Sequence, residues 1–395
     1  MDTLFDSDRH EPLLDRAWDS AAAADAIVRI ASDTAAAASP AGHWPEHPND
    51  GDSADPPAMG LYFGAAGVVW ALDYLAREGA APAGPNFAEH VPQMLALNHE
   101  SHVALKLQTR GYLVAAAGIL LLQYKLAPST AVADALAVVV AENTGDPALE
   151  LMWGAPGTML AALFMHRATG EARWAELFSI GAESLDRASV YDEAAGGYLW
   201  SQALYGQTMT FIGAVHGFSG NAYALWAGRG LLGPEAWARW SSRIAETLRA
   251  TAIRADGGVN WSALAPPDPK ALVQHCHGAP GMITTLGLLD EPIDDLLLAA
   301  GEMTWTAGPL TKGANLCHGT AGNGYAFLKL FERTGDQLWL DRARAFAMHA
   351  LAQSDAEAAA FGQRRHSLWT GDPGVACYLL DCIEARARFP TLHVF

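Results

Sequence analysis

The chain repeats a short glycine motif, and this repetition limits the folds that are open to it. A glycine pair spaced Gly-x-x-Gly precedes an apolar run each time, as in LMWGAPGTMLAAL (from Leu151) and LCHGTAGNGYAFL (from Leu316). Six motifs keep both glycines, and a seventh, degenerate one in RGYLVAAAGILLL has Ala115 in the first glycine's place. The six first glycines are Gly64, Gly154, Gly217, Gly278, Gly319 and Gly371. Similar units in this number indicate one repeat domain.

Each apolar run predicts a buried helix, because it lacks the alternation of a strand and extends over 10 to 15 residues. The intervening stretches, such as 234–252 and 337–352, place charged residues beside apolar ones at helical spacing and predict amphipathic helices. Seven helices of each kind can close into a ring inside a ring. We therefore predict an all-α fold, an (α/α) toroid of seven inner and seven outer helices. The first glycine of each pair should allow an unusual φ, and the second a close approach between neighbouring units.

A single domain is expected over residues 1–395, divided into two parts. Residues 1–59 comprise an Ala-rich helix (roughly 16–38) and a long irregular segment (39–59) rich in Pro, Gly and Asp, and residues 60–395 hold the seven repeats. A loop of this length is usually functional or mobile. It could lie over one mouth of the ring or form a disordered strap.

Composition excludes several classes of protein. The chain is 51% hydrophobic and 17% charged, which argues against disorder, and its net charge of −18 disfavours nucleic acid and anionic membranes as partners. Its longest apolar stretch, about 12 residues at 111–122, is short for a membrane-spanning helix. Four cysteines form no disulfide scaffold, and the acidic start lacks the features of a signal peptide. These features predict a cytoplasmic protein in a reducing compartment.

Two cysteines and a histidine stand in register within consecutive repeats. Cys276 and Cys317 each lie two residues before the first glycine of their turn, and His318 follows Cys317. In a ring of repeats, matching positions converge on one rim. Two thiolates and an imidazole with an open fourth position form a catalytic type of zinc site, and thiolates favour zinc over magnesium or calcium. We predict one zinc per chain at this site.

Other interpretations of these residues stay open. Two buried cysteines and a core histidine would give the same pattern without a metal. His275 and His277, which flank Cys276, could be ligands, partners of ligands or pocket residues, and we assign them to substrate binding because a fourth protein ligand would close the site. Cys377 and Cys382 lie on the last apolar run and are expected to be core residues.

A possible acid–base pair lies in the same register. His216 directly precedes the first glycine of its turn, and Glu150 lies four residues before Gly154. A histidine with a pKa near neutrality and a carboxylate suit proton transfer beside a metal. A structural histidine and a solvated carboxylate are the alternatives.

These motifs identify the sequence as similar to the lanthionine synthetase C-like family. The motifs are HCHGAPG (275–281), NLCHGTAGNGY (315–325), HGFSG (216–220) and SLWTGDPG (367–374), and the resemblance extends from about residue 56 to the end. The family's double ring agrees with the repeat count. The resemblance implies that zinc binds Cys276, Cys317 and His318 and activates a thiol for addition to dehydroalanine or dehydrobutyrine. The product would be a thioether, from peptide cyclisation or from glutathione addition.

The resemblance also implies roles and partners. His216 would handle the proton, Glu150 stands where cyclases carry Asp, and Lys312 matches a lysine that contacts a thiol ligand such as glutathione. The partners would be a thiol substrate, a peptide or protein with dehydroamino acids, and a separate dehydratase.

The sequence departs from the family at two places. His275 stands where the family usually has Trp, so the pocket wall would be polar. Arg364 and Arg365 replace an Asp-Pro-rich approach, and they could bind a substrate carboxylate or be solvated. The CHGAPG form resembles stand-alone members more than dedicated cyclases.

Two competing functions remain. The same ligands could serve a protein that binds glutathione or a thiol peptide without turnover. A glycoside-processing enzyme on a helical ring is a fold analogy that requires two facing carboxylates, for which Glu150 and Asp372 are the main candidates. The hypothesis of a glycoside-processing enzyme leaves Cys276 and Cys317 unexplained.

Overall fold

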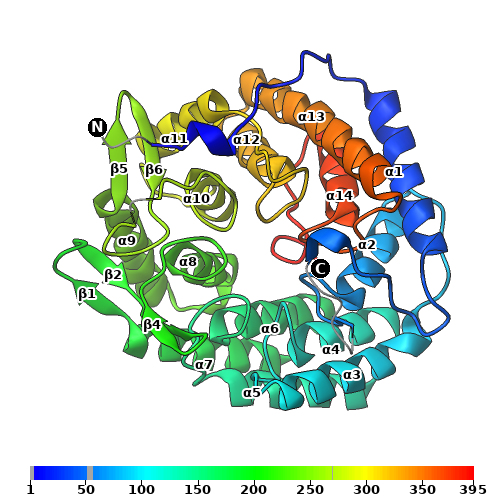
Figure 1. Ribbon diagram of the computed structural model, residues 1–395. Coiled ribbons are helices and arrows are strands. Elements are labelled where there is room, and N and C mark those ends of the chain that lie inside the picture. Colours follow the sequence, from blue (N-terminus) through cyan, green and yellow to red (C-terminus); the bar gives the residue numbers. More distant parts are fainter. Residues whose placement is uncertain (1–3, 51–56, 269) are drawn as a thin grey trace.

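The structure is a computed structural model that describes residues 4–50, 57–268 and 270–395. Within these ranges, fourteen α-helices form two concentric rings (Figure 1). The outer helices are α1 (Ser20–Ala36), α3 (Val91–Ala104), α5 (Thr130–Asn143), α7 (Ala172–Ala188), α9 (Pro234–Ala250), α11 (Asp294–Ala307) and α13 (Gln337–Phe361). The inner helices are α2 (Ala65–Arg77), α4 (Ala116–Leu126), α6 (Ala155–Thr169), α8 (Phe218–Ala227), α10 (Ala279–Leu286), α12 (Thr320–Thr334) and α14 (Asp372–Ile383). The predicted toroid is confirmed.

The chain alternates between the rings, and each outer helix precedes an inner one. Helix α14 packs against α1 and α2, which closes the ring between the two ends of the chain. The Ala-rich helix before the first glycine pair is therefore one of the outer helices. Residues 51–56 of the irregular segment, including the position where the family resemblance begins, lie outside the described residues. The division at residue 59 stays a prediction.

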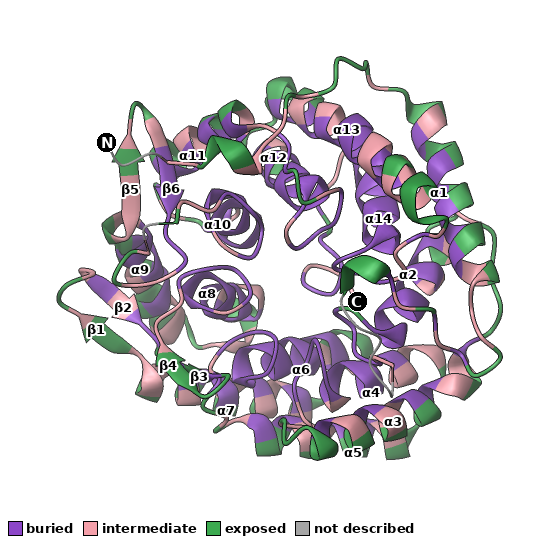
Figure 2. Cartoon of the chain, in the orientation of Figure 1, coloured by how far each residue is buried: buried purple, intermediate pink, exposed green. Residues whose placement is uncertain are grey.

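Burial separates the two rings (Figure 2). Every residue of α6 from Ala155 to Met165 is buried, as expected of a helix that has neighbours on all sides. The outer helix α9 buries one stripe, on which Trp240, Ile244 and Leu248 follow one another at a spacing of four. A stripe of this spacing lies on one side of a helix, so the outer ring packs inward and leaves its charged face to solvent.

The second glycine of each pair leaves room for two neighbours. A Cβ at Gly157 would lie 2.0 Å from the carbonyl oxygen of Leu151 and 2.7 Å from the side chain of Tyr112 in the preceding unit. The same backbone obstacle, the carbonyl six residues earlier, lies 1.9–2.4 Å from the position of a Cβ at all seven second glycines: Gly67, Gly118, Gly157, Gly220, Gly281, Gly322 and Gly374. The expected close approach between units is confirmed, and each turn also folds back on its own helix.

Five of the six first glycines do not serve the purpose predicted for them. Only Gly278 has a positive φ, +112°, whereas the other five have φ between −92° and −157°. Space is their main requirement, since a Cβ at Gly217 would lie 2.2 Å from the carbonyl oxygen of Phe211. Ala115 occupies the equivalent position with φ −135°, so ordinary extended backbone is used there.

Substitution of Gly157 by Ala should therefore destabilise the fold. The added methyl group meets a backbone oxygen, which cannot move without displacing the turn, and overpacking of this kind costs about 2–3 kcal/mol. Chemical denaturation would measure the loss. Gly230→Ala is the matched control, because nothing lies within 4 Å of its added Cβ. Equal stability of the two variants would contradict this role of the second glycine.

In the described part of the chain, three two-stranded hairpins interrupt the helices, and the all-α prediction did not include them. Two lie between α7 and α8: β1 (Val190–Asp192) with β2 (Gly197–Leu199), and β3 (Gln202–Leu204) with β4 (Gln207–Met209). The third, β5 (Ala252–Ala255) with β6 (Gly258–Trp261), lies between α9 and α10. Its turn residues Asp256 and Gly257 both have positive φ, 49° and 81°. An Asp-Gly pair is a recognised hairpin signal.

The C-terminal tail enters the middle of the ring (Figure 1). Tyr112 and Tyr223 donate hydrogen bonds from their hydroxyls to the carbonyls of Thr391 (2.6 Å) and Leu392 (2.7 Å). The ring of Phe395 lies within 6.4 Å of the rings of Trp70, Tyr112 and Phe164. The tail therefore fills the space that the inner helices surround.

The described part of segment 39–59 packs against the outer helices and the glycine turns. Trp44 donates to the carbonyl of Thr34 in α1 (2.6 Å), and Asn49 donates to Glu357 in α13 (2.6 Å). A cavity of about 260 Å³ separates this segment from Phe63 and Thr370, which belong to the first and last turns. The segment thus borders the face that carries the glycine turns.

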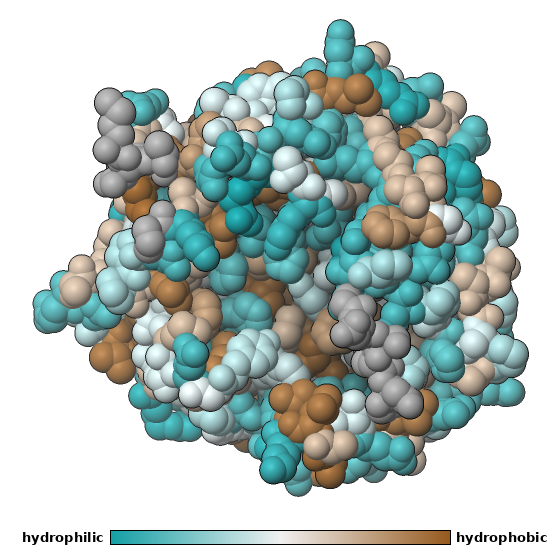
Figure 3. All heavy atoms as spheres, viewed as in Figure 1, coloured by the Kyte–Doolittle hydropathy of each residue, from teal (hydrophilic) through white to brown (hydrophobic). Residues whose placement is uncertain are grey.

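One face of the molecule shows how polar the surface is. On the face shown in Figure 3, hydrophilic residues predominate and apolar residues form small separate groups. No helix in the described ranges is long and apolar enough to cross a bilayer.

Candidate metal centre

A closed belt of backbone hydrogen bonds connects the turns that precede the inner helices. In each turn, an N–H two or three residues before the glycine position donates to a carbonyl in the next turn. The seven links, at 2.8–3.3 Å, run from Tyr62 to Leu113, Leu113 to Met152, Leu151 to Val215, Ala214 to Cys276, Cys276 to Cys317, Cys317 to Trp369 and Trp369 back to Tyr62. Matching positions of adjacent repeats therefore lie side by side.

The belt brings the three predicted ligands together. The Sγ atoms of Cys276 and Cys317 and a ring nitrogen of His318 all lie within 4.8 Å of one another. Both cysteines are buried, at 3% and 1% exposure, whereas His318 is only partly covered. Cys276 belongs to the turn before α10, and Cys317 and His318 belong to the turn before α12.

These side chains fit a single metal ion. Bonds of about 2.0–2.3 Å from two sulfurs and one nitrogen require ligand atoms a few ångströms apart, as they are here. Soft thiolates with an imidazole are donors that zinc prefers, and three protein ligands leave a fourth position open. In the described ranges this is the one such cluster of His, Cys, Asp or Glu side chains found. Cys377 and Cys382 are fully buried in α14, as expected of core residues.

The two thiols differ in acidity. Burial raises the pKa of Cys317, and its hydrogen bond with Cys276 raises it further. Burial also acts to raise the pKa of Cys276, but the hydrogen bond from Cys317 and the charges of His277 and His318 lower it below its usual value. One thiol of the pair can therefore lose its proton while the other keeps its proton and donates a hydrogen bond to it.

The buried Glu150 and the partly exposed His216 form a pair beside this group. The Glu150 carboxylate is completely buried and accepts hydrogen bonds from the backbone N–H groups of Met152 (2.9 Å) and Trp153 (2.5 Å). Its Oε2 lies 2.9 Å from Nδ1 of His216. This contact places a proton on Nδ1 and leaves Nε2 as the nitrogen that can exchange protons with a substrate. Burial acts to lower the pKa of His216, but the hydrogen bond and charge of Glu150 raise it above its usual value.

Removing the Glu150 charge should reverse the shift of the His216 pKa. In the wild type the pKa lies above 6.5, and in Glu150→Gln it should fall below 6.5, because burial is then opposed much less. The Glu150–His216 pair stabilises the fold fully at pH values below the pKa that His216 has in the unfolded chain. This contribution is lost as the pH rises through the pKa of His216 in the folded protein.

Titration of the His216 ring signals by NMR would measure both pKa values. Glu176→Gln, on the exposed side of α7, is the control and should change nothing. An unchanged His216 pKa in Glu150→Gln would show that the two side chains are not coupled.

The structure separates the two histidines that flank Cys276. His277 is half-buried, and its ring lies against those of Phe211 (5.9 Å) and His216 (6.2 Å), which also contact each other (5.9 Å). Burial lowers its pKa. His275 is completely buried, stacks on Phe389 at 4.1 Å, and has its pKa lowered by burial to about 3. His277 therefore lies beside the proposed acid–base pair, whereas His275 is a neutral residue of the ring's interior.

The basic residues predicted to bind substrate have different surroundings. Lys312 is exposed near the turn before α12, and its charge acts to lower the pKa of Cys317. Arg364 is buried and pairs with acidic side chains, and Arg365 pairs with Asp50 of the irregular segment. The partners of Arg364 are Asp33 (2.8 Å), Asp355 (3.4 Å) and Asp372 (3.7 Å). Lys312 is thus available to a ligand, whereas both arginines are engaged by carboxylates.

Asp372, the second carboxylate required for glycoside chemistry, is tied to α13. It is buried, accepts a hydrogen bond from the Ser354 hydroxyl (2.6 Å), and burial raises its pKa to about 6. These contacts give it a role in packing.

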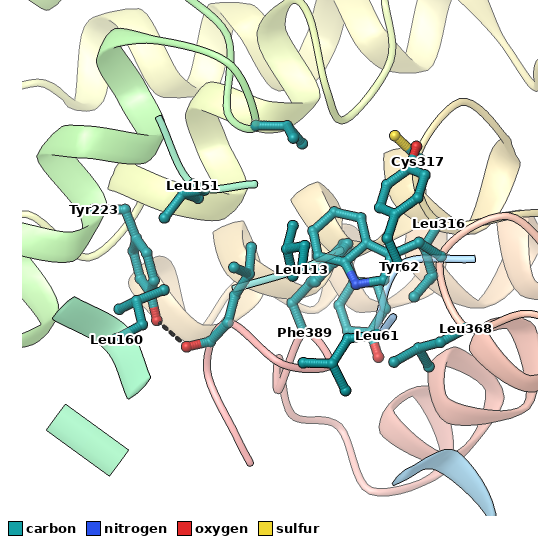
Figure 4. Packing of buried hydrophobic residues seen from close by; sticks show 14 of the residues in the cluster. Leu61, Tyr62, Leu113, Leu151, Leu160, Tyr223, Leu316, Cys317, Leu368 and Phe389 are labelled. Carbon is teal, nitrogen blue, oxygen red and sulfur yellow. Dashed lines mark hydrogen bonds between the residues drawn. The ribbon is translucent and has the colours of Figure 1, made fainter. Parts of the chain in front are cut away.

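Sequence reasoning missed two residues that contact the ligand sulfurs. The amide nitrogen of Gln274 donates to Sγ of Cys276 (3.1 Å), and the hydroxyl of Tyr62 points at Sγ of Cys317 (Figure 4). Tyr62 lies two residues before Gly64, the same register as both cysteines. That register could have identified it.

Comparisons with known proteins found a matching family model, similar sequences and a similar fold. A family model described as lanthionine synthetase C-like protein matches residues 15–394. Glutathione S-transferase LANCL1 of Danio rerio is 28% identical over 62% of this chain and 62% of its own. LanC-like protein GCL1 of Arabidopsis thaliana is 33% identical over 31% of this chain and 30% of its own. These matches span less than two thirds of both relatives. Among solved structures, nisin cyclase shares the fold, with a TM-score of 0.58 and 14% identity over 82% of this chain and 88% of its own.

Proposed function

The chain belongs to the lanthionine synthetase C-like family, and from this premise we propose that it joins a thiol to a dehydroamino acid. The reaction forms a thioether between the thiol sulfur and the β-carbon of dehydroalanine or dehydrobutyrine. The observation that carries the proposal is the Cys276, Cys317 and His318 cluster, with ligand atoms within 4.8 Å, near the Glu150–His216 pair.

The three clustered side chains would hold one zinc ion. Bound zinc lowers the pKa of a thiol at its open position, so that the thiol is present as a thiolate at neutral pH. Cys276 and Cys317 are buried, which keeps water from their sulfurs, while His318 is partly exposed. A substrate thiol would therefore approach from the side of His318.

His216 would move the proton of the reaction. Glu150 holds Nδ1 of the imidazole at 2.9 Å, so that Nε2 takes the proton that the thiol releases. The thiolate sulfur then forms a bond to the β-carbon, and the π electrons of the double bond move to the α-carbon. Nε2 returns the proton to that carbon, so no external acid, base or oxidant is needed.

Several observations bear on the substrates. The relative from Danio rerio is named a glutathione transferase, and the structural neighbour is named for the cyclisation of nisin. The exposed ammonium of Lys312 suits a carboxylate such as those of glutathione. We propose glutathione or a peptide cysteine as the thiol, and a peptide or protein that a separate dehydratase has modified as the electrophile.

The test is mass spectrometry of a dehydroalanine peptide incubated with glutathione and zinc-loaded protein. The expected result is a glutathione adduct, or a ring when the peptide contains its own cysteine, formed faster than without protein. Cys377→Ala is the matched control and should retain activity, because Cys377 is buried in α14 outside the cluster. Thiol binding without adduct or ring would overturn the proposal in favour of a binding protein.

A further inference from the structure

Both ligand sulfurs contact a second side chain that carries a hydrogen-bond donor. The Nε2 of Gln274 lies 3.1 Å from Sγ of Cys276. Gln274 is only 4% exposed, and two backbone hydrogen bonds with His277 (3.1 and 3.2 Å) fix the turn that carries it. The amide is therefore held against the sulfur by the turn itself.

Tyr62 makes the equivalent contact on the other cysteine. Its hydroxyl oxygen points at the sulfur of Cys317 (Figure 4). The backbone belt fixes Tyr62 at both ends, and its ring packs on that of Trp369 at 5.4 Å. A phenol is protonated at neutral pH, so it can donate a hydrogen bond to a thiolate.

The orientation of the Gln274 amide follows from the same chemistry. A metal-bound thiolate carries no proton, so it can accept a hydrogen bond from the amide N–H but cannot donate one. The amide oxygen of Gln274 has no hydrogen-bond partner in the part of the chain that the structure describes. A buried acceptor in this state costs about 1–3 kcal/mol. Stability of the fold therefore does not explain Gln274, whereas its contact with sulfur does.

A hydrogen bond to a thiolate changes its reactivity. The donor stabilises the negative charge, which makes the sulfur less basic and a weaker nucleophile. In the proposed reaction an electrophilic alkene comes close to the ligand sulfurs as well as the substrate sulfur. Addition of Cys276 or Cys317 to that alkene would also form a bond between a sulfur and the β-carbon. It would use up a metal ligand and destroy the site.

We infer that Tyr62 and Gln274 are positioning residues that suppress this competing reaction. They lower the nucleophilicity of the Cys317 and Cys276 sulfurs and leave the substrate thiolate as the one that reacts. The inference rests on the proposed function, because it assigns the two donors to a site that holds a metal and handles an electrophile.

Acrylamide provides a direct test, because it adds to thiolates without a leaving group and takes its proton from water. Zinc-loaded wild type, Tyr62→Phe and Gln274→Met would be treated, and modification of Cys276 and Cys317 followed by peptide mass spectrometry. Each variant should react roughly tenfold faster at the cysteine it contacts, because a thiolate that loses a hydrogen-bond donor becomes more basic and therefore more nucleophilic.

Matched controls separate this effect from a general loosening of the fold. Tyr223→Phe removes a buried hydroxyl that bonds to a backbone carbonyl (2.7 Å), and Gln353→Met removes an amide that bonds to Glu11 (2.7 Å). Neither contacts a ligand sulfur, so neither should change the modification of Cys276 or Cys317. Equal acceleration in the controls would overturn the inference.

A spectrum provides a readout that needs no reaction. In the cobalt-substituted protein, loss of a donor should move the sulfur-to-cobalt charge-transfer band to lower energy. Replacement of Tyr62 by 3-fluorotyrosine, a stronger hydrogen-bond donor, should move this band to higher energy and slow the modification of Cys317. This variant tests the role of Tyr62 if Tyr62→Phe does not bind metal. An unmoved band and unchanged modification with metal bound would overturn this inference alone. Wild type that binds no metal would overturn the proposed function as well.

Discussion

Cys317→Ala should lose its zinc and all thioether formation above the uncatalysed background. The substitution leaves one thiol and one imidazole, because Cys276 and His318 are the other members of the cluster. Two ligands cannot make the three-ligand site that zinc needs in an enzyme. Elemental analysis after reducing, chelator-free purification should find about one zinc per wild-type chain and only background metal in the variant.

The control for this prediction is another buried cysteine. Cys377→Ala also removes a buried thiol, at 0% exposure, but from α14 and away from the cluster. It should keep its zinc and its activity. If Cys317→Ala retained zinc, or Cys377→Ala lost it, the assignment of the ligands would be wrong.

His216→Asn should keep its zinc and lose catalysis. Proton transfer by a positioned side chain contributes about 10²–10⁴-fold to a rate, and we expect kcat to fall by that factor. The KM for the thiol should change little, because the imidazole contacts Glu150 and is not one of the three clustered ligands. Steady-state kinetics with glutathione and a dehydroalanine peptide, together with metal analysis, would measure both quantities.

The chain contains a well-matched control for this substitution. His349, which is buried, also pairs with a glutamate, since its Nε2 lies 2.7 Å from Oε1 of Glu11. It belongs to α13 in the outer ring, so His349→Asn should lose a similar pair without loss of activity. A full rate in His216→Asn would contradict the role given to His216.

Much of the fold could be predicted because the repeats can be aligned with one another in the sequence, so that corresponding positions are known. The glycine pairs mark where each inner helix begins, and the residue two positions earlier enters the belt in every unit. Adjacent repeats with cysteine at that position must therefore place two sulfurs together. His318 was predicted on the same basis.

The rest depends on contacts between residues far apart in the chain. Arg364 looks available in the sequence, but Asp33, 331 residues away, binds it because α1 closes the ring beside α14. His275 stands beside a ligand, yet its side chain turns inward onto Phe389 of the C-terminal tail. Neither neighbour could be identified from local pattern.

The local signals that were missed are of another kind. The Asp256-Gly257 turn is a short-range hairpin signal, but the strong helical repeat concealed it. Tyr62 shares the register of the cysteines, and only a comparison of all seven turns would have revealed it.

The central claim is that a substrate thiol binds to a zinc ion held by Cys276, Cys317 and His318. Zinc X-ray absorption of the purified protein, with and without glutathione, tests it most directly. Without glutathione the spectrum should contain two sulfur ligands at about 2.3 Å, from the two cysteines, and with glutathione it should contain three. A sulfur count that stays at two with saturating glutathione would contradict the claim, and so would a protein that holds no zinc.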